Sequence, residues 1–281
     1  MSAVQIAQNL AFINWTVLTG LALGSYAAVV LLRTRSMATR GFLGFTTLCA
    51  IGFGFLAWLS DGALPASLGD APVVVDPAWD GPRRVTLGAF VALVAAGLLA
   101  RRAVPTWAPL AEAVALAAGV ATLLFAALAW GSAAGAPGIA ALAVQLGVLA
   151  AATGGVFAAM ILGHWYLVTP KLPEAPLILL ARLLTAVVAL QVVLFAVSIA
   201  IGAGPAGGAP LSALTGEWAL FVWLRLIVGL VFPLIVSWAA IQTARSRSME
   251  SATGLLYINV GTIASGTILA AGLYFGAGLL V

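Results

Sequence analysis

Long apolar runs separated by short polar segments dominate this chain. Runs bounded by charged residues or by Gly/Pro clusters predict eight helices, at about 10–32, 41–60, 85–100, 106–131, 138–168, 176–202, 217–243 and 253–280. A helix needs about 20 mainly apolar residues to cross a bilayer, and each run is near that length. The pattern predicts an all-α, polytopic membrane protein with one transmembrane domain over residues 1–281.

The composition agrees with this class of protein. Apolar residues make up 63% of the chain and charged residues 7%, whereas a soluble domain carries about 25% charged residues. Cys49 is the only cysteine, so the chain has no internal disulfide and no cysteine-rich metal site. The formal net charge of +4 is accounted for by arginines in loops, so we expect no nucleic-acid partner.

The basic residues sort to one side of the predicted membrane domain. The loops and helix ends after the first, third, fifth and seventh spans hold Arg33, Arg35, Arg40, Arg101, Arg102, Lys171, Arg182, Arg245 and Arg247. The opposite loops hold only Arg83 and Arg84. Because basic residues stay on the cytoplasmic side, we predict both termini outside, in a multi-pass protein of the inner (plasma) membrane.

Small residues predict how the helices pack. Gly20 and Gly24 in the first span and Gly272 and Gly276 in the eighth form GxxxG pairs, which let helix backbones approach closely. A Gly/Ala pattern in the first span, from Gly24, recurs in the fifth, and each precedes a basic loop. This predicts a repeat of four plus four helices in the same orientation.

The longest loop, at about 60–84, lies on the predicted outer side. It is acidic and rich in Pro and Gly, with a small apolar patch at 73–75. It is either a structured cap over the helix ends or a docking surface for an extracytoplasmic partner.

Two ionisable residues fall inside predicted spans. Arg225 lies about 12 Å deep from the outer side, and Glu112 lies about six residues past the inner boundary. Charges are costly in hydrocarbon, so both are candidate functional residues. Arg225 either has a functional partner or turns outward to a loop carbonyl or lipid phosphate. Glu112 either relays protons or hydrogen-bonds a neighbouring helix. They enter from opposite sides, so we do not pair them.

His164, the only histidine, lies at the inner end of the fifth span. One histidine excludes a bis-histidine haem held by this chain alone, and Met160 on the same helix could not reach the opposite haem face. His164 is either an interfacial residue bonded to a carbonyl or headgroup, or a proton-exchange group at the inner surface.

Asp61 ends the second span on the outer side. It is either a helix-end residue in water or part of a site. The sequence contains no metal-ligand pair, nucleophile elbow or phosphate loop, so we expect no cofactor bound by this chain alone and no catalysis without partners.

Two stretches resemble the membrane subunit of the polysulfide-reductase (NrfD-like) family. Asn14 and Trp15 open a Gly/Ala-rich first span, and Asp61, Gly62 and Pro65 are similar to the family's acidic, Gly and Pro pattern at the end of the second span. The resemblance covers about 50 residues, and beyond them only the number of helices agrees.

The resemblance implies a quinone- or quinol-interacting subunit that exchanges electrons with an iron–sulfur partner protein and binds no haem itself. Asp61 would lie near the quinone headgroup, with Asn14 or Trp15 on the facing helix. The implied partners are other membrane or extracytoplasmic redox subunits, and lipids. The alternatives are a small-solute or ion transporter that uses Arg225, Glu112 and a kink at Pro233, or a cofactor-free scaffold subunit.

Overall fold

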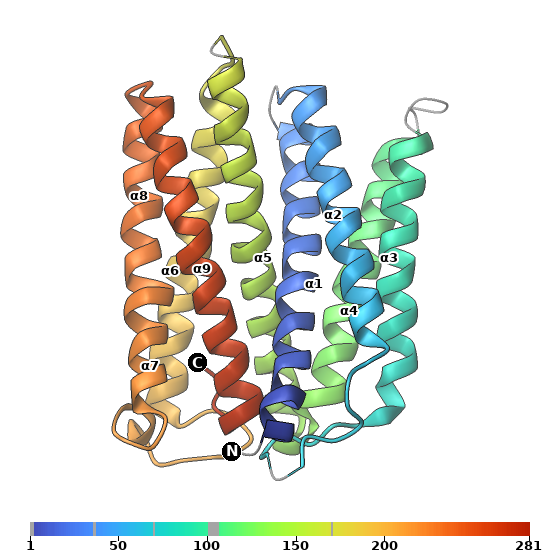
Figure 1. Ribbon diagram of the computed structural model, residues 1–281, viewed down its shortest axis with the longest axis vertical. Coiled ribbons are helices and arrows are strands. Elements are labelled where there is room, and N and C mark those ends of the chain that lie inside the picture. The colour runs from blue at the N-terminus through green and yellow to red at the C-terminus, as the bar shows by residue number, and fades with distance from the viewer. Residues whose placement is uncertain (1–2, 36–37, 70, 101–106, 170) are drawn as a thin grey trace.

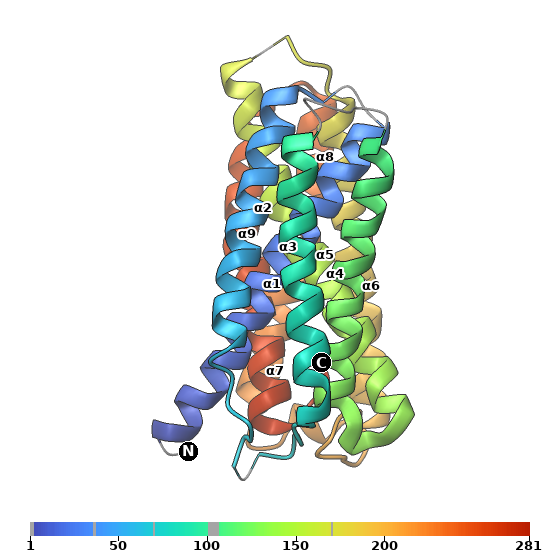
Figure 2. The ribbon, with the colours of Figure 1, turned by 90° about the vertical axis from the view of Figure 1, so that its right-hand side faces the viewer.

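The structure, a computed structural model, describes residues 3–35, 38–69, 71–100, 107–169 and 171–281. The described residues form a bundle of helices that run along its long axis (Figures 1 and 2). The α-helices are α1 (Ala3–Arg35), α2 (Arg40–Asp61), α3 (Asp80–Ala100), α4 (Ala108–Gly131), α5 (Gly135–Val168), α6 (Ala175–Ile201), α7 (Ala219–Leu226), α8 (Phe232–Arg245) and α9 (Met249–Ala277). Shorter helical turns are η1 (Pro77–Trp79), η3 (Ser132–Ala134), η4 (Ser212–Leu214) and η5 (Ile227–Val231).

Apolar helices account for most of the molecule. Among the described residues, 7 helical stretches are long and apolar enough to cross a membrane. One of them, Ala108–Val168, has 61 residues and would extend about 90 Å as a single helix. It reverses at η3, where Gly135 has a φ of 64°, and α5 packs back against α4. The prediction of an all-helical, multi-pass membrane protein is confirmed at this level.

Helix α3 begins earlier than the sequence predicted. The carboxylate of Asp76 accepts a hydrogen bond from the backbone N–H of Ala78 at 3.0 Å and so caps η1. Asp80 follows in the first turn of α3, where the helix dipole favours an acidic side chain. Arg83 and Arg84 therefore belong to α3, and the prediction that they lie in a loop was wrong.

The kink expected at Pro233 takes the form of a change in helix type. Pro233 lies in the first turn of α8, directly after η5, which is a π-helical turn. Proline has no backbone N–H to donate, so a regular α-helix loses one hydrogen bond there. The wider turn accommodates this loss, and Ala219–Arg245 stays one helical stretch.

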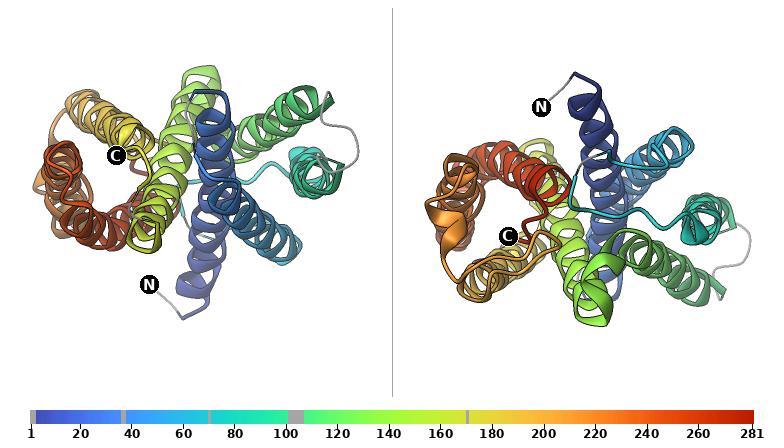
Figure 3. Two further views of the ribbon diagram at one scale, coloured as in Figure 1. Left: turned by 90° about the horizontal axis from the view of Figure 1, so that it is seen from above. Right: turned by 90° about the horizontal axis from the view of Figure 1, so that it is seen from below.

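Helices α1 and α5 cross in close contact at the centre of the bundle (Figure 3). Gly20 faces Ala150, and a Cβ added to Gly24 would lie 2.9 Å from the Cα of Gly154. The backbones can meet only because these positions carry no side chain, as the first GxxxG pair predicted. The second GxxxG pair does not bring backbones together in this way, because an added Cβ at Gly272 of α9 would lie 3.6 Å from the side chain of Ile13 on α1, an ordinary packing distance.

The helices fall into two groups with the same pattern of neighbours. Helix α2 packs on α1 and α3, and α3 packs on α4. In the second group α6 packs on α5 and α8, and α8 packs on α9. Between the groups, α4 packs on α5 and α9 packs on α1 (Figure 3).

The segment between α2 and α3 crosses the lower end of the bundle as drawn in Figure 1. Leu68 and Val73 are each 3% exposed and belong to the hydrophobic core. The backbone N–H of Asp76 donates to the carbonyl of Ala129 at the end of α4, at 2.8 Å. This segment is therefore a structured cap over the helix ends, the first of the two expectations for it.

Candidate functional site

Asp61 is buried where α2 ends. Its Oδ2 accepts hydrogen bonds from Trp15 Nε1 at 2.8 Å and from Arg83 Nε at 2.8 Å. Arg83 Nη2 lies 3.5 Å from the other carboxylate oxygen. Three helices thus meet at one carboxylate, and Trp15 and Asp61, which the family resemblance singled out together, are in direct contact.

Arg83 is as deeply buried as its partner. Its side chain is 2% exposed, and its Nη1 donates to Asp80 Oδ1 at 2.7 Å. Its guanidinium lies 5.9 Å from the ring centre of Trp15 and 5.0 Å from that of Trp130. Two carboxylates and two aromatic faces therefore compensate one buried cation, which is what a buried ion pair needs to be tolerated.

Arg84 lies at the solvent-exposed edge of the same site. Its guanidinium lies 4.5 Å from the ring centre of Trp58, and its Nη1 is 4.0 Å from Asp61 Oδ1. We call Trp15, Asp61, Asp80, Arg83 and Arg84 the Asp61 cluster. Because its two carboxylates balance its two arginines, the cluster is neutral overall.

Asn14 precedes Trp15 but is not part of the cluster. Its side chain lies on the exposed face of α1. Within the described residues no hydrogen bond involves this amide. Asn14 is therefore a polar group on the outside of an apolar helix, one position from the cluster.

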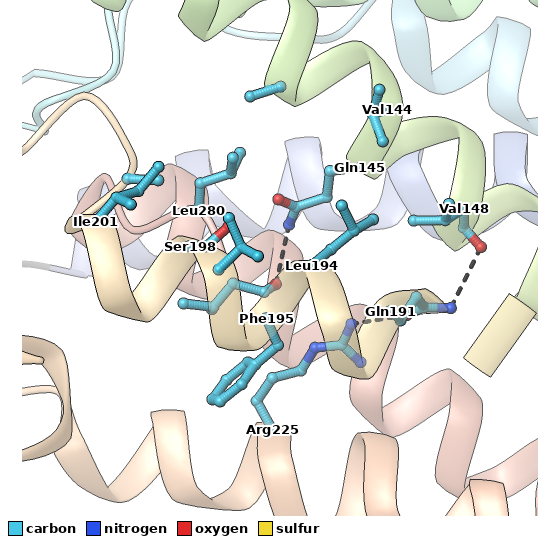
Figure 4. A pocket seen from close by; sticks show the side chains of 14 residues that line it. Val144, Gln145, Val148, Gln191, Leu194, Phe195, Ser198, Ile201, Arg225 and Leu280 are labelled. Carbon is cyan, nitrogen blue, oxygen red and sulfur yellow. Dashed lines mark hydrogen bonds between the residues drawn. The ribbon is translucent and has the colours of Figure 1, made fainter. Parts of the chain in front are cut away.

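Arg225 is buried in the second group of helices. Its Nη2 donates to Gln191 Oε1 on α6 at 2.7 Å, and its Nη1 donates to the carbonyl of Gly229 at 3.2 Å. Its Nε is buried and has no hydrogen-bond partner. No carboxylate of the described residues lies within ion-pair distance of it. Arg225 is 3% exposed and points into the bundle (Figure 4).

A cavity of about 160 Å³ adjoins Arg225 (Figure 4). It lies between α5, α6 and the last residues of the chain, and its walls are mostly aliphatic. Its polar groups are Arg225, Gln191, Gln145 and Ser198. The Gln191 Nε2 is hydrogen-bonded to a carbonyl of α5 at 3.3 Å, and the Gln145 Nε2 to a carbonyl of the chain end at 3.2 Å.

Glu112 is paired at the other end of the molecule. It forms an ion pair with Arg33 at the end of α1, and the two side chains are 6% and 20% exposed. Glu112 and Arg225 are therefore not partners of each other, because each pairs with a residue on a neighbouring helix. The proton-relay hypothesis for Glu112 stays a prediction.

His164 is exposed at the same end. Its Nδ1 lies 3.5 Å from the hydroxyl of Tyr257 on α9. An exposed imidazole near the end of a membrane-spanning helix fits an interfacial residue, and the proton-exchange role stays a prediction. The part of the chain that the structure describes contains no group of three His, Cys, Asp or Glu side chains that could hold a metal ion.

Reasoning from the sequence missed the partners of two candidate residues: Arg83, which bonds Asp61, and Gln191, which bonds Arg225. Arg83 was assigned to a loop, although Asp80 three residues earlier is the spacing of an ion pair on one helix. Gln191 lies in the apolar run that forms α6, and nothing in its sequence context indicated contact with Arg225.

No protein-family model matches this chain, and neither does any curated protein.

Proposed function

We propose that this protein is a membrane subunit of an electron-transfer complex that binds a quinone or quinol, with the redox centres supplied by partner subunits. The observation that carries the proposal is the contact between Trp15 and Asp61 beside the exposed amide of Asn14. It joins the two stretches that resemble the NrfD-like family. A quinone site needs an apolar, lipid-accessible surface and one or two polar groups for the carbonyl oxygens.

Asp61 and Asn14 have different roles in the proposed site. Both oxygens of Asp61 are engaged by Arg83 and Trp15, so Asp61 fixes the local charge and the positions of its neighbours. Asn14 is the group on this part of α1 that can donate a hydrogen bond to a ligand arriving from the lipid. The quinone ring would lie against the exposed face of α1, with a carbonyl oxygen on the Asn14 amide.

Asn14→Leu is expected to weaken quinone binding about fivefold and to leave the melting temperature unchanged. It removes one hydrogen bond, worth about 1 kcal/mol, from an exposed side chain without a protein partner. The measurement is titration of the purified protein with a water-soluble short-chain quinone. Tyr257→Phe, which removes another exposed polar group, is the matched control and should bind quinone normally. Equal affinities of Asn14→Leu and the wild type would remove Asn14 from the site.

The proposal includes a topology of eight membrane crossings in the inner (plasma) membrane, with both termini outside. The reversal at η3 supports counting α4 and α5 as two crossings, and α7, η5 and α8 count as one. The shared neighbour pattern of α1–α4 and α5–α9 supports a repeat of two four-helix halves. The basic residues in the last turns of α1 and α8, and Lys171 after α5, support the orientation.

Cysteine labelling tests this orientation. In a Cys49→Ala background, Ser67→Cys in the exposed loop after α2 should react with an impermeant maleimide on intact cells. Ser246→Cys, exposed after α8, should react only after the membrane is opened. The reverse pattern would place the termini inside.

A transport function is a second candidate, because Arg225 is a buried cation beside a cavity and next to a π-helical turn. It predicts that the purified protein moves an anion across a liposome membrane and that Arg225→Ala abolishes this flux. If the wild-type protein moves no anion, the transport function is wrong and electron transfer is the candidate that stays.

A further inference from the structure

The two groups of helices each contain one deeply buried arginine near the same end of the bundle. Arg83 is the fourth residue of α3 and bonds Asp61 on α2. Arg225 is the seventh residue of α7 and bonds Gln191 on α6. Helices α2 and α3 occupy the same places in the first group as α6 and the α7–α8 stretch in the second. The two arginines can therefore be compared directly.

Their counter-charges differ. Arg83 contacts the carboxylates of Asp61 and Asp80, whereas the partners of Arg225 among the described residues are a neutral amide and a backbone carbonyl. Arginine keeps its charge inside a protein. A buried cation without a paired anion is strongly unfavourable. Among the described residues, Arg83 has carboxylate partners within ion-pair distance and Arg225 has none.

The chain also makes room for the guanidinium of Arg225. Gly229 and Gly266 approach each other beside it, and a Cβ on either would lie 3.2 Å or 2.9 Å from Arg225 Nη1. Any side chain at these positions would crowd the charged group. The guanidinium of Arg225 is therefore closely packed against the backbones of Gly229 and Gly266.

The cavity beside Arg225 is open to molecules in the bilayer. Val144 of α5 and Val197 and Ile201 of α6 line it and are 49%, 50% and 66% exposed. These aliphatic side chains lie on the surface of membrane-spanning helices, so the cavity has an apolar entrance between α5 and α6. Leu194 and Phe195 continue the apolar wall inward (Figure 4).

We infer that the cavity between α5 and α6 binds an amphiphile with an oxyanion head, and that the carboxylate or phosphate of this head supplies the counter-charge that Arg225 lacks. The head accepts hydrogen bonds from Arg225, whose Nε has no hydrogen-bond partner among the described residues. The alkyl chain leaves along the aliphatic entrance between the two helices. Two sources share this chemistry, a free fatty acid and an anionic phospholipid.

Binding of oleate to the purified, delipidated protein tests this site. The measurement is the displacement of a bound fluorescent fatty acid by oleate. Oleate should compete and oleyl alcohol, which has the same chain without the charge, should not. Arg225→Gln should lower the affinity for oleate at least tenfold, and Arg182→Gln, which removes an exposed arginine of α6, should leave it unchanged. Competition by phosphatidylglycerol but not by oleate would identify the phospholipid as the source.

A second variant tests the site even if Arg225→Gln does not fold. Val144→Trp fills the entrance from its exposed side and leaves Arg225 in place, so it should also abolish oleate and phosphatidylglycerol binding. Equal competition by oleyl alcohol and oleate would overturn the inference, and so would unchanged binding in the folded Arg225→Gln protein. Failure of both amphiphiles to bind the wild type would overturn it as well. None of these results depends on quinone binding at Asn14.

Discussion

Arg83→Ala is expected to cost about 3–5 kcal/mol of stability, because it removes one partner of a buried ion pair and leaves the other charge in place. It leaves the carboxylate of Asp61 buried with the indole of Trp15 as its hydrogen-bond donor. The nearest opposite charge is then the more exposed Arg84, whose Nη1 lies 4.0 Å from Asp61 Oδ1. It also removes the guanidinium that packs against the rings of Trp15 and Trp130 and leaves a space beside them. The measurement is thermal or chemical unfolding of the purified protein in detergent.

Two further variants separate charge from packing. Asp80→Asn should cost less than about 1 kcal/mol, because the Asp80 side chain is 41% exposed. The double variant Asp61→Leu with Arg83→Met should recover most of the stability lost in Arg83→Ala, since a buried pair can be replaced by apolar side chains of similar size. Wild-type stability in Arg83→Ala would show that the pair does not hold α2 and α3 together.

Gly24→Ala and Gly154→Ala are expected to destabilise the protein by about 1–3 kcal/mol each, because an added methyl group would push α1 and α5 apart. The Cβ of residue 24 would lie 2.9 Å from the Cα of residue 154, and the contact is between backbones, which cannot move aside as a side chain can. The same unfolding measurement applies.

Gly155→Ala is the matched control for this crossing. It lies one residue further along α5, where no atom comes within 4 Å of an added Cβ. Alanine favours helix more than glycine does, so this variant should be as stable as the wild type or more stable by up to about 1 kcal/mol. Equal losses in Gly154→Ala and Gly155→Ala would contradict the close crossing.

The helical, membrane-spanning character of the fold could be predicted because hydropathy acts over whole segments and needs no tertiary information. The close crossing at Gly20 and Gly24 was also foreseen, since spacing on one helix shows which face can approach a neighbour. The start of α3 was missed because it depends on the caps at Asp76 and Asp80, which hold an otherwise polar stretch in helical form.

The sites were harder to predict than the helices. Arg225 stood out as a charge in an apolar run, but its partner Gln191 lies 34 residues earlier on another helix. Arg83 was missed because a charge next to a loop usually faces water, whereas this one is buried against Asp61 and the rings of Trp15 and Trp130. Partners between helices depend on which faces meet, and one sequence does not determine that.

Purification from the native membrane tests the central proposal most directly. The complex should be isolated under mild detergent conditions through a tag on this chain and examined by absorption and electron paramagnetic resonance spectroscopy and by quinone extraction. The proposal predicts partner subunits that carry iron–sulfur or haem centres, together with a quinone that is reduced or oxidised when those centres turn over. A protein that purifies alone or as an oligomer of itself, without redox centres and without quinone, would contradict it.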